Sequence, residues 1–208
     1  MQPLRLALAP NGPKRLEVAW RGRWKDLTLT LDGAPVLTVP TEAELKAGRE
    51  VRTQAGTLAV QLKTPAFGRE LWLTLDGRPI PQTAADPAKR LQQSYGVLYF
   101  VAGLSIALGA AATVFEVGPL ADMGFGWLSI AFGAVIALLA VGVHRSHSLV
   151  ALSLAIGILG LDGVLGVAGA MRGGGSAPTQ GIVIRVLVLL WVSRGLGALR
   201  ELRQQEGR

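Results

Sequence analysis

The sequence predicts a small all-β domain followed by a membrane α-helical bundle of four transmembrane helices. The two halves of this chain of 208 residues differ in kind. Residues 1–94 contain short runs in which apolar and polar residues alternate, which is typical of half-buried strands. Residues 95–200 contain four long apolar segments, each of about 20 residues, the length that a helix needs to cross about 30 Å of hydrocarbon.

The alternating runs predict the β domain over residues 1–85. Four runs carry their apolar residues at every second position: Leu16, Val18 and Trp20; Leu27, Leu29 and Leu31; Leu58, Val60 and Leu62; Leu71, Leu73 and Leu75. Two of them end in Asp32-Gly33 and Asp76-Gly77, residues that tolerate positive φ in hairpin turns. We expect a small antiparallel sheet or sandwich of about six strands.

Two features lie between these runs. The segment Leu29–Pro35 is echoed at Leu73–Pro79, which fits either a duplicated domain or two similar hairpins. Thr41 and Glu44 form a capping box, so we expect one helical turn that ends near Gly48.

A helical linker is predicted to join the two halves. Asp86 is a good N-cap and Pro87 suits the first helical position, so residues 86–94 should run as helix into the membrane. The four transmembrane helices are predicted at about 95–115, 123–143, 148–170 and 181–199, and a tail follows at 201–208.

The basic residues beside the apolar segments predict the orientation. Those that must share one side in this arrangement are Lys89, Arg90, Arg145, Arg200 and Arg203. Because cytoplasmic loops carry the excess of Lys and Arg, we expect a multi-pass protein of the cell inner membrane with both termini and the β domain in the cytoplasm. The start of the chain shows no signal-peptide pattern.

A basic and aromatic cluster is the candidate contact surface of the β domain. It consists of Trp24 with Arg21, Arg23 and Lys25, and Trp72 is a second exposed aromatic candidate. Such a cluster can hold anionic headgroups, or nucleic acid in other proteins. It also fits an ordinary hairpin tip in which Trp20 lies in the core and the cations are solvated.

Asp162 and Arg185 are the charged residues placed well inside the apolar segments. A carboxylate near a helix centre costs about 2.5 to 3.5 kcal/mol on insertion scales, so it needs a partner or a function. Arg185 lies about 7 Å away in depth, within reach of an arginine side chain. The two residues are therefore predicted either to pair structurally or to form an ion-handling site of a small transporter or channel.

Small residues recur at helix-packing spacing in the first two apolar segments. They are Gly103, Ala107 and Ala111, and then Ser129, Gly133 and Ala137. Small residues allow helix backbones to approach closely in lipid, so this pattern favours a tight bundle or a homo-oligomer.

Other chemistry has little support in the sequence. The chain has no cysteine, and His144 and His147 have no further ligand nearby, so neither a metal site nor a cofactor is expected. The sequence shows no combination of Ser, His and Asp residues that would suggest an enzyme. The glycine-rich residues 171–178 lack the context of a phosphate loop and are expected to form an external connection.

The order of features resembles that of a family of uncharacterised bacterial membrane proteins with a small N-terminal β domain and four transmembrane helices. The resemblance rests on Trp24-Lys25-Asp26-Leu27, Asp76-Gly77-Arg78-Pro79-Ile80-Pro81, Asp86-Pro87 and Leu161-Asp162-Gly163. It implies the division into β domain and helices, and it implies no catalytic residue.

Taken together, these patterns favour a non-enzymatic integral membrane protein. Its cytoplasmic β domain is expected to bind a cytosolic protein partner or lipid headgroups, and no nucleic acid partner is expected. The alternative is the transporter or channel that uses Asp162 and Arg185.

Overall fold

The computed structural model describes residues 3–65, 68–122, 125–172 and 179–206. It divides into two compact units, Met1–Lys89 and Arg90–Arg208. We refer to them as the β unit and the helical unit.

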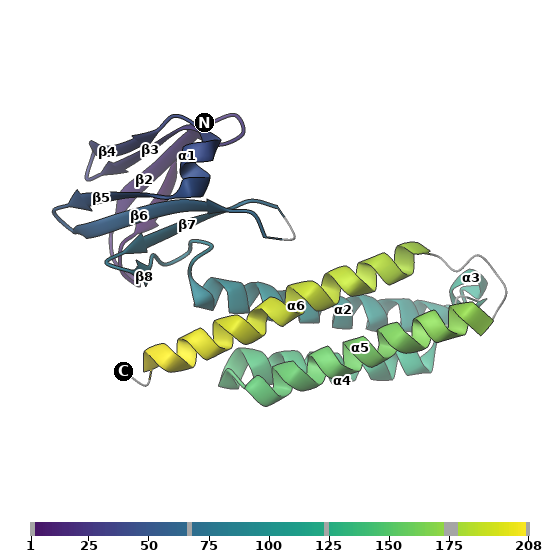
Figure 1. Ribbon diagram of the computed structural model, residues 1–208. Coiled ribbons are helices and arrows are strands. Elements are labelled where there is room, and N and C mark those ends of the chain that lie inside the picture. Colours follow the sequence, from purple (N-terminus) through teal and green to yellow (C-terminus); the bar gives the residue numbers. More distant parts are fainter. Residues whose placement is uncertain (1–2, 66–67, 123–124, 173–178, 207–208) are drawn as a thin grey trace. The chain divides into compact units, whose positions relative to one another are not determined.

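The described part of the β unit contains eight strands in two antiparallel sheets of four strands each (Figure 1). In each sheet the strands follow one another in chain order, β1-β2-β3-β4 and β5-β6-β7-β8. The expectation of about six strands was therefore too low. The bounds are β1 Leu4–Ala7, β2 Lys14–Arg21, β3 Lys25–Leu31, β4 Ala34–Val39, β5 Arg49–Thr53, β6 Gly56–Lys63, β7 Glu70–Leu75 and β8 Arg78–Pro79.

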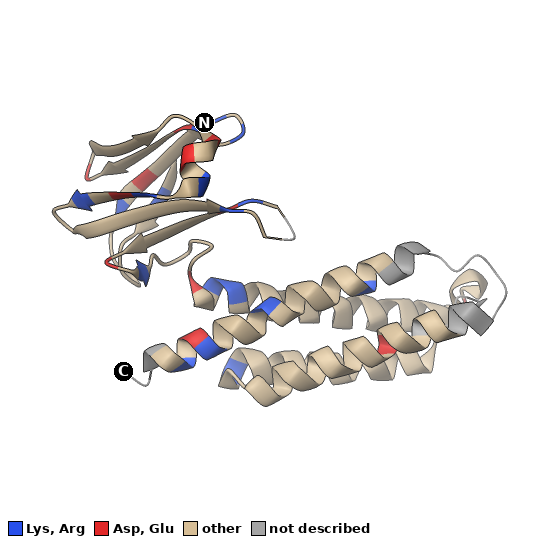
Figure 2. Cartoon of the chain, viewed as in Figure 1, with Lys and Arg blue, Asp and Glu red and all other residues tan. Residues whose placement is uncertain are grey.

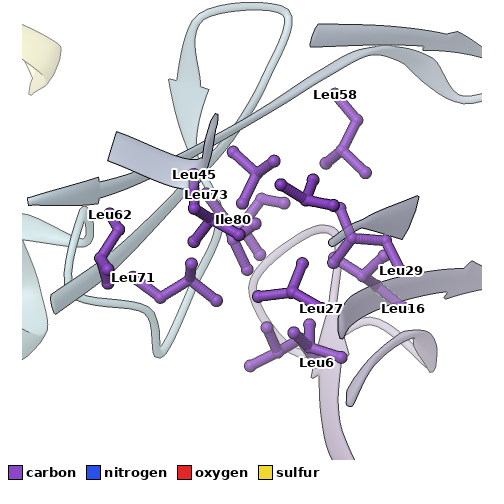
Figure 3. Packing of buried hydrophobic residues seen from close by; sticks show 13 residues of the cluster. Leu6, Leu16, Leu27, Leu29, Leu45, Leu58, Leu62, Leu71, Leu73 and Ile80 are labelled. Carbon is purple, nitrogen blue, oxygen red and sulfur yellow. The ribbon is translucent and has the colours of Figure 1, made fainter. Parts of the chain in front are cut away.

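The inner faces of both sheets contribute to a single leucine-rich core (Figure 3). The alternating positions of β2, β3, β6 and β7 supply most of it, as the period of two predicts. Leu45 from the short helix α1, Glu42–Ala47, is also fully buried in this core. The side chain of Thr41 accepts a hydrogen bond from the backbone N–H of Glu44, which confirms the predicted cap.

The inner hairpins of the two sheets have the same pairing register over most of their length, so the β unit contains two similar meanders. Val18 lies opposite Leu29 in the first sheet, and Val60 lies opposite Leu73 in the second. The hairpins agree as well, because Thr30 pairs with Pro35 and Thr74 pairs with Pro79. Neighbouring pairs correspond as well. Leu16 pairs with Leu31 as Leu58 pairs with Leu75, and Glu17 pairs with Thr30 as Ala59 pairs with Thr74. In the outer pair, Arg5 lies opposite Glu17 as Glu50 lies opposite Ala59. The two sheets are therefore similar meanders, which fits both interpretations of the sequence echo.

The described part of the helical unit contains four long helices and a short one. Helix α2 spans Pro87–Val114, α3 Gly118–Asp122, α4 Trp127–Ser146, α5 Leu149–Arg172 and α6 Thr179–Glu206. Helix α2 begins where the sequence predicts, because the carboxylate of Asp86 accepts a hydrogen bond from the backbone N–H of Ala88 at 2.9 Å.

The predicted fold class, a bundle of four membrane-spanning helices, is wrong. Among the described residues, only α2 and α4 are both long enough and apolar enough to cross a membrane. The part of α5 whose side chains the structure describes without a gap, Leu149–Leu165, is apolar with Asp162 as its one charged residue, and it is shorter than a span requires. The apolar sequence of α6 is interrupted by Arg185, Arg194 and Arg200, and Arg194 lies inside the predicted segment 181–199 as a further charged residue besides Asp162 and Arg185.

Close helix contacts depend on glycines that the sequence identified only in part. A methyl group on Gly133 of α4 would lie 2.7 Å from the carbonyl oxygen of Ala102 in α2. Gly109 of α2 is equally close to α4, at 2.8 Å from the carbonyl oxygen of Gly126. Gly103, which belongs to the predicted small-residue face of α2, has open space around it. The α2–α4 contact therefore uses another face of α2.

Candidate functional site

The β2–β3 hairpin carries the basic cluster at its tip. Gly22 and Trp24 both adopt positive φ there, 50° and 61°, and Arg21 pairs with Lys25 across the strands. The indole of Trp24 folds back and stacks on that of Trp20, with ring centroids 4.8 Å apart and an angle of 19° between the planes. Both rings are half-buried and pack against the core. The tip is therefore cationic at its surface and aromatic beneath.

The three tip cations differ in their partners from five of the ten other cations of the β unit, which form ion pairs with carboxylates. Elsewhere the pairs are Arg5–Glu17, Arg15–Asp32, Lys46–Glu42, Arg49–Glu44 and Arg69–Glu42, with N···O distances of 2.5 to 2.9 Å. Arg21, Arg23 and Lys25 are exposed, and no described carboxylate lies within 4 Å of their charged groups. Their positive charge is thus available to an external anion.

Two carboxylates of the paired set show what such a partner does. The hydrogen bond from the Arg15 guanidinium lowers the pKa of Asp32 below the ordinary range. A hydrogen bond from Lys46, together with the charges of Arg69 and Lys46, lowers the pKa of Glu42. These two acids are therefore held in the charged form by neighbouring cations.

Trp72 lies on the outer face of β7, opposite Gln61 of β6. The ammonium group of Lys63 stands 3.6 Å from the centre of its ring, a cation–π contact. The ring is half-buried and partly covered by this lysine. Trp72 therefore belongs to the second sheet, whereas the tip cluster lies on the β2–β3 hairpin of the first sheet.

Asp162 and Arg185 come together between α5 and α6. The guanidinium Nε lies 3.2 Å from Oδ2 of Asp162, and Nη1 donates a hydrogen bond of 3.4 Å to the carbonyl oxygen of the same residue. Both side chains are close to 40% exposed. The arrangement supplies one anion already neutralised by one cation.

At the start of α2, near the end of α4 and near the end of α6, residues make contacts that the sequence did not reveal. The ring of His144 stacks on Tyr95, with centroids 4.6 Å apart, and meets Tyr99 edge-on. Arg90 of α2 forms an ion pair with Glu201 of α6. These two residues are 111 positions apart in sequence, so no spacing pattern could have paired them.

The two histidines do different things in the structure. His144 belongs to the aromatic contact just described, and His147 adopts the left-handed conformation that ends α4. Within the described ranges, no group of three or more His, Cys, Asp or Glu residues could hold a metal ion. The glycine-rich connection predicted over 171–178 lies, from residue 173 on, outside the described residues.

A shallow cleft of about 490 Å³ lies beside the β7–β8 turn. Its lining residues are Leu8, Leu75, Asp76, Arg78 and Pro79. The carboxylate of Asp76 already accepts a hydrogen bond of 2.7 Å from the backbone N–H of Thr57. The described lining residues include no Ser, Thr, Cys, His or Lys that could act as a nucleophile beside Asp76.

No family model, curated protein or solved structure matches the chain. The resemblance to bacterial membrane proteins of this layout accordingly stays an expectation.

Proposed function

We propose that the chain is an integral membrane protein in which the hairpin of α2 and α4 crosses the bilayer. The observation that carries this proposal is the surface of the helical unit, where large apolar side chains stand exposed on every long helix. Examples are Phe100 of α2, Leu138 of α4, Val150 of α5 and Ile184 of α6, each at least 60% exposed. Only 22% of the most apolar part of α2 and of α4 is buried, so neither helix resembles the core helix of a soluble protein.

The charged residues of this unit support one orientation. Most of them gather where α2 begins, α4 ends and α6 ends (Figure 2). The contact between Tyr95 and His144 supports the placement of the start of α2 and the end of α4 at the same depth in the membrane. Because Lys and Arg favour the cytoplasmic side, we place this end, the β unit and both termini in the cytoplasm of a bacterial cell, with the protein in the inner membrane.

We further propose that the β unit binds anionic lipid headgroups through the hairpin tip. The tip cations Arg21, Arg23 and Lys25 lie together at one hairpin turn and have no carboxylate partner among the described residues, whereas five of the ten other cations of the unit have one. Each Lys or Arg near an anionic membrane surface contributes about 1 kcal/mol of attraction. The proposed role of the tip is therefore binding.

The test compares two triple variants of the full chain in detergent. The tip variant combines Arg21→Gln, Arg23→Gln and Lys25→Gln. The control combines Lys14→Gln, Arg52→Gln and Arg78→Gln, three exposed cations that likewise have no described carboxylate partner. Both remove the same charge, so nonspecific attraction falls equally.

The readout is co-sedimentation with vesicles of phosphatidylglycerol and phosphatidylcholine, against phosphatidylcholine alone. We expect the parent and the control to bind the anionic vesicles, and the tip variant to bind at least about tenfold more weakly, because three contacts of about 1 kcal/mol are lost. Equal binding by the two variants would show that the tip is not the site.

A further inference from the structure

The tip of the β2–β3 hairpin contains a cross-strand pair of like charges. Among the described residues, three cross-strand pairs join two charged side chains. The two complementary pairs are Arg5 with Glu17 and Lys63 with Glu70. The third pair joins Arg21 to Lys25. Like charges directly opposite each other destabilise a sheet, so this pair weakens the hairpin tip unless an anion lies beside both cations.

A bulge in β3 creates the like-charged pair. The register of the preceding pairs, continued without change, would place Asp26 opposite Arg21 and give a third complementary pair. Instead the register shifts by one residue, so Arg21 lies opposite Lys25. Asp26 adopts a φ of 48° at this shift, and its backbone N–H donates to the carbonyl oxygen of Pro40 at 3.2 Å. Bulges redirect side chains and are frequent beside functional sites.

Both side chains of the pair are available to an external anion. Arg21 and Lys25 are exposed, and no described carboxylate lies within 4 Å of either charged group. Residues directly opposite in an antiparallel pair have Cβ atoms about 4.5 to 5.5 Å apart, so both side chains start from one small area of the surface. Arg23, in the turn between them, adds a third positive charge.

A phosphomonoester fits two adjacent cations better than a phosphodiester does. At pH 7 a phosphomonoester carries a charge of about −1.5 to −2 and three acceptor oxygens, because its second pKa is about 6. A guanidinium binds phosphate through two parallel hydrogen bonds, and an ammonium group supplies a point charge with further donors. A phosphodiester has a single negative charge, so it would leave one of the two cations uncompensated.

We infer that Arg21 and Lys25 clamp one phosphomonoester group. The hairpin tip therefore selects a headgroup such as that of phosphatidic acid over phosphodiester headgroups of equal total charge. This inference rests on the proposed binding of anionic headgroups by the tip, and it names the class of headgroup. The same chemistry occurs in soluble phosphate esters, for which glycerol 3-phosphate is the probe.

Vesicles of matched charge test the selection. One set contains about 10 mol% phosphatidic acid in phosphatidylcholine and the other about 20 mol% phosphatidylglycerol, so their charges are nearly equal at about pH 8, where the phosphomonoester is almost doubly ionised. In co-sedimentation, the full chain should bind the phosphatidic acid vesicles about fivefold more tightly, because one more cation is compensated.

Two double variants show which cations carry the preference. Arg21→Gln combined with Lys25→Gln should bind both sets of vesicles equally. The control combines Lys14→Gln with Arg52→Gln, two exposed cations of the β unit without a described carboxylate partner, and it should keep the preference. Loss of the preference in both variants would overturn the clamp.

Lys25→Glu adds a measurement of stability. This change gives a complementary cross-strand pair with Arg21, so it should raise the thermal unfolding midpoint while it abolishes the preference for phosphatidic acid. A preference that survives in the folded Lys25→Glu protein would overturn the clamp.

The outcomes separate this inference from the proposed function. If the parent binds both sets of vesicles equally and the triple tip variant binds neither, the clamp is wrong and headgroup binding by the tip stands. If the triple tip variant binds as tightly as the parent, the proposed function is wrong as well. Release of the parent from phosphatidic acid vesicles by excess glycerol 3-phosphate would support the clamp with a soluble ester as its occupant, and retention together with the preference would support it with the lipid.

Discussion

Asp32 and Asp76 occupy equivalent positions in the two sheets of the β unit. Each adopts positive φ, 51° and 50°, and each donates its backbone N–H to the neighbouring inner strand, at Arg15 and at Thr57. Their carboxylates then diverge. That of Asp32 accepts from the guanidinium of Arg15 at 2.7 Å, and that of Asp76 accepts from the backbone N–H of Thr57 at 2.7 Å. The repeat thus keeps the turn and changes the side-chain contact.

The first prediction concerns the pH dependence of the Arg15–Asp32 pair. The pKa of Asp32 is lowered in the folded state by the hydrogen bond and charge of Arg15. Its stabilisation is therefore present above the unfolded pKa of about 3.9 and is lost as the pH falls through the lower folded value. The difference in denaturation midpoint between the parent and Asp32→Asn should narrow below about pH 4. In an Arg15→Gln background, Asp32→Asn should show no such pH dependence.

A second prediction follows from the side chain of Asp76. A methyl group on Gly56 would lie 2.2 Å from Oδ2 of this residue, and Gly56 has a φ of 129°. Gly56→Ala should therefore lower the free energy of unfolding by about 2 kcal/mol or more, through strain and loss of the Asp76 hydrogen bond. Gly33→Ala is the control, because its φ is 84° but no atom lies within 4 Å of the added methyl. Equal losses in both variants, measured by chemical denaturation, would argue against the steric part.

The stacked tryptophans predict that Trp24 and Arg23, two neighbouring residues of the hairpin tip, differ in their contribution to stability. Trp24→Ala removes a half-buried ring from the stack with Trp20 and should cost about 2 kcal/mol of stability. Arg23→Ala removes an exposed cation and should change stability by less than about 0.5 kcal/mol. Thermal unfolding monitored by tryptophan emission measures both. A stable Trp24→Ala protein would mean that the ring is not part of the packing.

The glycine contacts of α2 and α4 predict opposite effects for two similar changes. Gly133→Ala places a methyl group 2.7 Å from the carbonyl oxygen of Ala102, so the helices must separate. We expect a loss of about 1–3 kcal/mol, the usual range for overpacking. Gly103→Ala meets open space and favours the helix, so it should be neutral or mildly stabilising. Thermal unfolding in detergent provides the comparison.

Topology is checked by thiol labelling in the cysteine-free chain. Ser146 lies at the end of α4, and Glu116 lies between α2 and α3; both are exposed. With an impermeant maleimide, Glu116→Cys should react in intact cells and Ser146→Cys only after the inner membrane is opened. Reaction of both residues from one side would contradict a membrane-crossing hairpin. The reverse pattern would place the β unit outside the cytoplasm.

The four alternating runs predicted the inner strands β2, β3, β6 and β7 because each buries one face. The alternating pattern did not identify the outer strands, and the reason is physical. Strand β5, for example, has the sequence Arg-Glu-Val-Arg-Thr, and only its pairing with β6 makes it a strand. In the helical unit, small residues lie on several faces of α2, so the sequence could not choose the face with Gly109 over the face with Gly103. The pairing of Arg90 with Glu201 depends on the fold alone.

The chain order of both sheets bears on how the protein is made. Every strand pair joins segments that are neighbours in sequence, so each hairpin closes over a short loop, and such local contacts favour rapid folding. Because the N-terminal part leaves the ribosome first, the hairpins can assemble while the apolar helices are still being synthesised. In the proposed membrane location, the nascent chain would then reach the insertion machinery with its N-terminal domain already folded, which favours retention of that end on the side where translation takes place.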